Sequence, residues 1–197
     1  MATRFYFRST TANVGTLGNG NLSSTLEVGT LDDSGNAIQD LSRIKGSAET
    51  TRSNTSLAQT GQQSEYMGRH VSEDLGAAGI TALAANTWTL AFVGTEGASF
   101  ANALARVSVY VVTSSDTVRG FVYDATADLG VEFDATGQVV TFAGSAVSSI
   151  VSGDKLVCEL WIVATQGMAT AYTNTIAYDG ASTPASRGLW ATHATVA

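Results

Sequence analysis

Short segments of alternating apolar and polar residues recur along the second half of the chain. An apolar run covers residues 88–93, and further segments follow at intervals of about eight to twelve residues. Gly, Asp and Ser lie between them, where tight turns need these residues. The expected strands cover residues 88–93, 104–113, 117–123, 131–133, 138–142, 145–150, 156–163 and 170–178. This spacing predicts an all-β fold, an antiparallel, jelly-roll-like β-sandwich with a C-terminal tail over residues 70–197.

The first part of the chain has a different pattern. Residues 9–63 are rich in Ser, Thr, Asn, Gly and Gln, with isolated aliphatic residues. Such a segment buries too little apolar surface to offset the entropy lost on ordering. We therefore predict that residues 1–69 form an extended N-terminal arm that becomes ordered on a neighbouring subunit, with a disordered tail as the alternative. Leu26 and Val28 lie in an alternating segment and are the expected contacts with that neighbour.

Large aromatic residues near both ends of the sequence also need a surface on which to pack. Residues 4–8 alternate, which predicts a short aromatic strand with Phe5 and Phe7 on one face. These two rings either pack back on the sandwich or contact another chain. Trp190 stands apart in the C-terminal tail. We expect Phe5, Phe7 and Trp190 to lie at contacts between subunits, which predicts a homo-oligomer, with a trimer favoured.

Composition favours strands over helices, and the charge limits the partners. Only 14% of the residues are charged, whereas long helices are rich in Glu, Lys and Arg. There are 10 Lys and Arg residues against 17 Asp and Glu residues, and the basic residues form no stripe. We therefore expect no nucleic-acid partner. The sequence has no apolar run of about 18 residues and no apolar signal segment, so we expect neither a membrane partner nor secretory export.

The sequence contains few of the residues that known catalytic and cofactor-binding motifs require. The two histidines, His70 and His193, are far apart in the sequence, and the Gly-x-Ser-x-Gly pattern of a nucleophile elbow is missing. Cys158 is the single cysteine and lies in an apolar run, so it is expected to be a small buried side chain. From this inventory we predict no catalytic, cofactor-binding or metal-binding residues, no cofactor, and no enzymatic activity.

Two groups of residues offer chemical alternatives. The densest acidic stretch contains Asp124, Asp128, Glu132 and Asp134. Its carboxylates match a calcium loop or the acid pair of a glycosidase, although we interpret them as turn and surface residues. The aromatic residues, among them Trp88 and Trp161, offer stacking surfaces for a sugar, although a core position is expected for Trp161.

Several motifs follow one another from residue 70 onward. His70–Leu75 comes first, residues 102–112 and Thr117–Gly120 form a hairpin, and Ser152–Val157 leads into a strand. Over roughly residues 70–182 this order resembles a β-sandwich module of tailed-bacteriophage virion structural proteins. Residues 139–142 depart from the arginine-containing strand that many members of that group carry.

Two residues of these motifs have expected structural roles. Arg119 is expected to brace its hairpin by pairing with a turn carboxylate, and Asp116 is the nearest candidate. Asp154 is expected to accept amide hydrogen bonds at the tight entry to the next strand.

The resemblance implies a virion structural protein. The leading hypothesis is a capsid decoration (cement) protein that binds and stabilises the outer shell, with the major capsid protein or other virion proteins as partners. The alternative is a tail- or fibre-associated module that recognises a host glycan. An acidic chain fits the capsid exterior, since proteins packed against DNA are usually basic.

Overall fold

The structure, a computed structural model, describes residues 4–11, 39–42, 49–55, 63–97, 102–124, 130, 132–133, 137–164, 173–179 and 188–191. Every regular element among these residues is a strand, which confirms the predicted all-β class. The strands are β1 (Arg4–Thr11), β2 (Gln39–Ser42), β3 (Glu49–Thr55), β4 (Gln63–Asp74), β5 (Asn86–Thr95), β6 (Ala103–Val112), β7 (Val118–Tyr123), β8 (Gln138–Gly144), β9 (Lys155–Ala164), β10 (Thr173–Asp179) and β11 (Gly188–Ala191).

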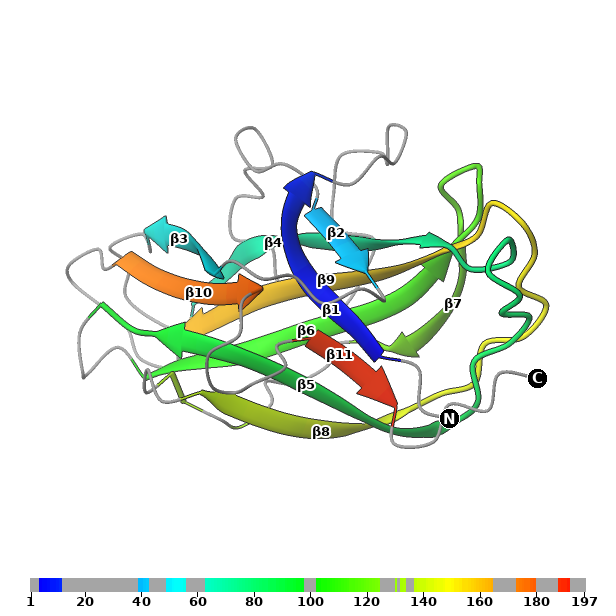
Figure 1. The fold of residues 1–197 in the computed structure, drawn as a ribbon. Coiled ribbons are helices and arrows are strands. Elements are labelled where there is room, and N and C mark those ends of the chain that lie inside the picture. Colours follow the sequence, from blue (N-terminus) through cyan, green and yellow to red (C-terminus); the bar gives the residue numbers. More distant parts are fainter. Residues whose placement is uncertain are drawn as a thin grey trace.

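The strands build a β-sandwich, as the spacing of the apolar segments predicts (Figure 1). Hydrogen bonds connect them in the order β3-β10-β5-β11-β1-β2-β4-β9-β6-β7, and β8 pairs with β5 beside this path. One layer contains β4, β9, β6 and β7, and the facing layer contains β5, β8, β10 and β11. Among the described strands all pairs are antiparallel except β2 with β4.

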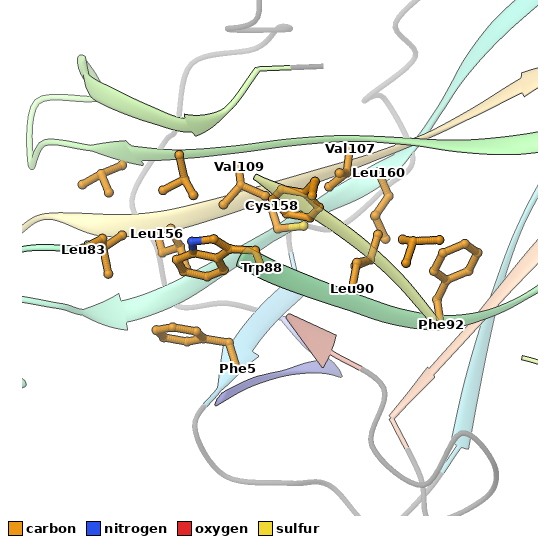
Figure 2. Packing of buried hydrophobic residues seen from close by; sticks show 14 of the residues in the cluster. Phe5, Leu83, Trp88, Leu90, Phe92, Val107, Val109, Leu156, Cys158 and Leu160 are labelled. Atoms are coloured by element: carbon orange, nitrogen blue, oxygen red, sulfur yellow. The ribbon is translucent and has the colours of Figure 1, made fainter. Parts of the chain in front are cut away.

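The main hydrophobic core fills the space between the two layers (Figure 2). Trp88, Leu90 and Phe92, alternate residues of β5, point toward alternate residues of β6 and β9. Cys158 of β9 is fully buried among them, as the sequence predicts, and this burial raises the pKa of its thiol. A smaller cluster on the other face of the layer that contains β4, β6 and β9 comprises Val71, Tyr110, Val112 and Val157.

Strands from the first 69 residues pair with strands from the second half of the chain. β1 lies between β11 and β2, β3 pairs with β10, and β4 pairs with β9 along most of its length. Phe5 of β1 is 1% exposed in the main core, so its ring packs back on the sandwich. Leu26 and Val28 lie outside the described residues.

Two of the expected strands are only isolated bridges. Residues 145–150 contribute a single bridge, between Val147 and Leu83. Ser149 has a φ of 61°, in the left-handed region, which is incompatible with an extended strand. Glu132 likewise makes only a bridge with Leu104. The prediction of a strand at 145–150 is therefore wrong, and of the strand expected at 131–133 the described residues 132–133 show only this bridge.

Candidate functional site

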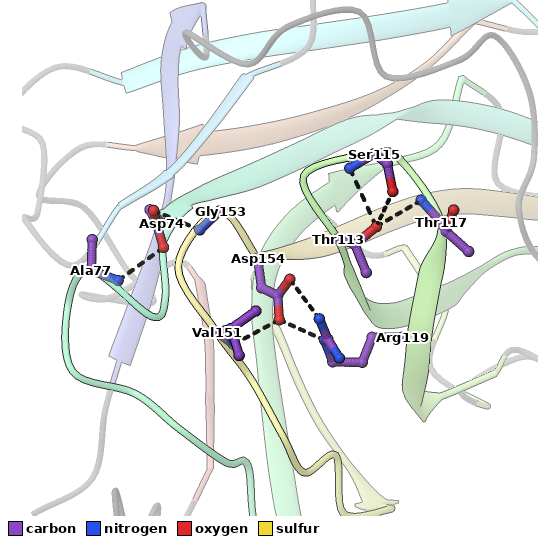
Figure 3. Close-up of polar contacts among 9 residues, drawn as sticks. All are labelled: Asp74, Ala77, Thr113, Ser115, Thr117, Arg119, Val151, Gly153 and Asp154. Carbon is purple, nitrogen blue, oxygen red and sulfur yellow. Dashed lines mark hydrogen bonds and ion pairs between the residues drawn. The ribbon is translucent and has the colours of Figure 1, made fainter.

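Three loops meet at one end of the sandwich, where hydrogen bonds join the first loop to the third and Arg119 joins the β6–β7 hairpin to the third (Figure 3). We call residues 74–80, 113–117 and 150–155 the loop cluster. The backbone N–H of Leu75 donates to the carbonyl of Asp154 at 2.8 Å, which joins the first loop to the third. Gly153 has a φ of 93° and leaves less than 3 Å between an added Cβ and Ser114, so the second loop packs closely on the third.

Asp74 ties the first loop of the cluster to the third. Its carboxylate accepts hydrogen bonds from the backbone N–H of Ala77 at 2.9 Å, the N–H of Gly153 at 2.8 Å and the hydroxyl of Ser152 at 3.1 Å. These donors stabilise the charged form and hold the pKa of Asp74 below its usual value, with the Ala77 amide as the largest cause and desolvation opposing it. No pattern in the sequence distinguishes Asp74 from other acidic residues near turns.

Arg119 connects the β6–β7 hairpin to the third loop. Its Nη2 donates to Oδ1 of Asp154 at 3.1 Å, and its Nε donates to Oδ2 of the same carboxylate. The expected partner, Asp116, is therefore the wrong turn carboxylate. Asp154 also accepts the N–H of Val151 at 2.9 Å, which confirms its predicted role at the entry to β9. Such a bidentate pair fixes the orientation as well as the distance of the two groups.

A second polar group is buried on the face of β4, β9 and β6 that points away from the main core. Arg69 pairs with Glu159 through Nε at 3.1 Å and Nη2 at 2.9 Å, and the two side chains are 3% and 0% exposed. Ser108 of β6 lies next in the same row and is also buried. The sequence signal for this pair is a glutamate inside an apolar run of β9, which the sequence analysis did not use.

The structure places the predicted contact residues in different surroundings. Phe7 lies on β1, where its backbone pairs with Leu41 of β2. Trp190 lies on β11, where its backbone pairs with Arg4 on one side and Thr89 on the other. The roles of Phe7, Trp190, Leu26 and Val28 in contacts between subunits stay predictions.

The chemical alternatives gain little support from the described residues. Glu132 is exposed and Asp124 is half-buried, while Asp128 and Asp134 lie outside the described residues. No group of three or more metal-binding side chains occurs in the part of the chain that the structure describes. Trp88 and Trp161 are 1% and 0% exposed, so neither ring is available to stack on a sugar. Over the same residues, no helix has the length and apolarity needed to cross a membrane.

Comparisons with known proteins return structural similarities alone. No family model matches the chain, and no curated protein matches it. A CocE/NonD family hydrolase from Staphylococcus aureus is similar at 8% identity and a TM-score of 0.48, over 97% of this chain and 36% of the hydrolase chain. A structure of infectious bursal disease virus is similar at 14% identity and a TM-score of 0.35, over 86% of this chain and 40% of that chain.

A third similar structure is an aminopeptidase from a marine sediment Thaumarchaeota archaeon, with 5% identity, a TM-score of 0.45 and coverage of 75% of this chain. This chain spans about a third of the length of the hydrolase and aminopeptidase chains. The prediction that the chain has no enzymatic activity is contradicted, because these similar structures are enzymes. The shortage of catalytic templates in the sequence is therefore no basis for excluding an enzyme, and that exclusion is withdrawn.

Proposed function

We propose that the chain is a virion structural protein, a capsid decoration protein that binds the exterior of the shell. Its partners in this proposal are the major capsid protein or other virion proteins and further copies of itself. The sandwich supplies a rigid body, and the segment at residues 12–38 reaches neighbouring subunits, with Leu26 and Val28 as the apolar contacts. The resemblance of residues 70–182 to phage virion modules supports this assignment.

The observation that carries the proposal is the pairing of β1 with β2. Thr11, the last residue of β1, is paired with Gln39, the first residue of β2. Residues 12–38 connect these two paired ends in the sequence, and they contain Leu26 and Val28 in an alternating pattern. A two-residue turn is enough to connect strands paired in this way. The 27 residues between these ends are therefore more than such a connection requires, which supports a further role for them.

This geometry allows the segment to be removed without cutting into the sandwich. Deleting residues 1–66 would take away β1 with the core residue Phe5 and part of β4. Replacing residues 12–38 by Asn-Gly keeps β1 and β2 and supplies a turn suited to an antiparallel hairpin. We expect this variant to unfold at nearly the same temperature as the parent chain.

The first experiment locates the protein on intact virus particles. Immunogold electron microscopy with antibody against residues 71–197 is expected to label the surface of the head. Label confined to the tail would contradict the decoration role and favour the alternative, a tail- or fibre-associated module that recognises a host glycan.

The second experiment measures capsid stability. Parent protein added to capsids stripped of it is expected to raise their melting temperature, whereas the variant with Asn-Gly in place of residues 12–38 is expected to give little of this gain. A double substitution, Leu26→Asp and Val28→Asp, tests the two apolar contacts in the full-length chain. Full capsid stabilisation by both variants would show that the segment has no part in binding.

A further inference from the structure

The strands at the margins of the sandwich differ in how they are protected from pairing with other chains. Free strand edges offer unpaired backbone groups, and natural proteins usually protect them with charges, prolines or bulges. β3, at one end of the hydrogen-bonded order, carries Glu49 and Arg52. β7, at the other end, carries Arg119 and pairs with β6 through two register shifts.

β8 has none of these protections. Its sequence from Gln138 to Gly144 contains no charge and no proline. It pairs with β5 over seven consecutive residue pairs without a register shift, so it is regular along its whole length. Among the described strands β5 is its only pairing partner, and in Figure 1 β8 forms the lower border of the sandwich.

The outward row of β8 is uncharged as well. Burial alternates along the strand, so Val139, Thr141 and Ala143 face outward while their neighbours fill the core. Val139 is 56% exposed and is one of two large exposed hydrophobic residues in the described part of the chain. The end of the strand is anchored, because the N–H of Ser145 donates to the carbonyl of Val122 at 2.7 Å.

We propose that the edge of β8 that pairs with no other described strand binds the same edge of a second copy of this chain in an antiparallel pair. A two-fold axis at Thr141, the middle residue of β8, places Thr141 opposite its own copy and Val139 opposite Ala143 on both sides. Facing threonines and small apolar pairs are favourable across strands. The pairing joins the β5–β8 layers of the two sandwiches into one continuous sheet.

The self-complementary register and the lack of charge on β8 favour a second copy as the occupant. The chain has a net charge of −7, which disfavours close approach of two copies at most surfaces. The outward row of β8 brings no charged residue opposite its copy, so this is a surface where that repulsion is small. Each chain offers one β8 edge, and pairing uses both edges, which closes the assembly as a dimer at this interface.

Substitutions at Thr141 test the interface by sedimentation velocity. Thr141→Lys places two like charges directly opposite each other and is expected to raise the dissociation constant of the β8 dimer at least about fivefold. Thr117→Lys is the matched control, since Thr117 is also an exposed threonine but lies in the β6–β7 hairpin. Thermal melting of both variants establishes that they fold like the parent. A monomeric parent, or equal weakening by both substitutions, would overturn the proposal.

A cross-linking experiment gives an independent answer. Thr141→Cys is expected to form a disulfide-linked dimer under mild oxidation, because facing residues in an antiparallel pair bring their Cβ atoms within about 5.5 Å. Thr117→Cys is expected to stay monomeric. The native Cys158 is fully buried, so it does not compete. No cross-link at position 141, or equal cross-linking at both positions, would contradict the β8 interface. This interface is independent of the capsid role, so head labelling tests one proposal and cross-linking the other.

Discussion

Strands from the two layers of the sandwich, β8 in one and β6 and β9 in the other, differ in how many of their faces are buried. In β8 the residues alternate strictly between buried and exposed, so one face of that strand points to the outside. In β6 the residues from Val107 to Val112 are all buried, and in β9 Leu156 through Trp161 are buried as well. β6 and β9 therefore have two buried faces, as does β5 from Trp88 to Phe92, whereas β8 has one.

This difference explains where the buried charges are. Arg69 and Glu159 lie on the second buried face, away from the main core. Removing a charge from water costs several kcal/mol, so a buried charge is tolerated only when an oppositely charged partner forms hydrogen bonds with it. The exposed row of β8 carries no such constraint. Mutations at neighbouring positions should therefore behave differently in β9 and in β8.

The largest expected effect comes from breaking the buried ion pair. Arg69→Met removes the guanidinium that donates twice to Glu159 and is expected to lower the free energy of unfolding by about 3–5 kcal/mol. Urea denaturation measures this loss. The double substitution Arg69→Met and Glu159→Leu removes both charges and is expected to recover most of the stability. Equal losses in the single and double variants would show that packing, and not charge, determines the effect.

Truncating either of two adjacent residues in β9 should lower stability. In β8, only one of two adjacent residues should do so, because the strand alternates between buried and exposed positions. Leu156→Ala is expected to cost about 2–5 kcal/mol and Val157→Ala about 1.5 kcal/mol or more, because the two side chains are buried on opposite faces. In β8, Phe142→Ala is expected to cost about 3–5 kcal/mol and Thr141→Ala less than about 0.5 kcal/mol. Denaturant titrations at low protein concentration give all four values. A Val157→Ala variant as stable as the parent would contradict the difference in burial between β9 and β8.

The same contrast holds between the last two residues of β8. A Cβ added at Gly144 would lie 2.4 Å from Cδ1 of Trp88, so Gly144→Ala is expected to cost about 1–3 kcal/mol through overpacking. Ala143→Ser, on the exposed face, is expected to change stability by less than about 0.5 kcal/mol. Thermal melting measures the stability, and Trp fluorescence reports any shift of the indole. An undisturbed Gly144→Ala variant would show that Trp88 has room to move.

The smallest effect is expected in the loop cluster and depends on pH. The amide hydrogen bonds, with that of Ala77 as the largest cause, hold the pKa of Asp74 below its ordinary value of 3.8. A lowered folded-state pKa adds stability above pH 3.8, and this contribution is lost as the pH falls through the folded-state value. Asp74→Asn is therefore expected to lower stability near neutral pH and to flatten its dependence on pH below 3.8. Urea midpoints across that range test this, and an unchanged slope would contradict it.

The sequence predicts the strands whose apolar residues define them. β5, β6, β8 and β9 all lie within or close to the expected ranges, because each carries a run or an alternation of apolar side chains. β3 could not be found in this way, since Glu-Thr-Thr-Arg-Ser-Asn-Thr contains no apolar residue. Its place depends on pairing with β10 over all seven positions, a contact that a local pattern does not record.

The candidate site is harder to predict for the same reason. Glu159 is a visible exception in an apolar run, but its partner Arg69 is 90 residues away in the sequence. Arg119 is expected to pair with a turn carboxylate, and local spacing indicates Asp116 of its own hairpin, whereas the fold brings in Asp154 from another loop. Local spacing indicates which residues need a partner, and only the sheet order determines which partner each receives.

The position of β1 has a consequence for how the chain folds. Arg4 is paired with Trp190, and β1 lies between β11 and β2 in the sheet. During synthesis β1 leaves the ribosome before β11, so one of its edges lacks this partner until residues 188–191 have emerged. Pairing of segments so distant in sequence makes folding slow, because the chain must close a very long loop before the contact forms. We expect the late docking of β11 beside β1 to limit the rate of folding, and the exposed edge of β1 to need protection until then.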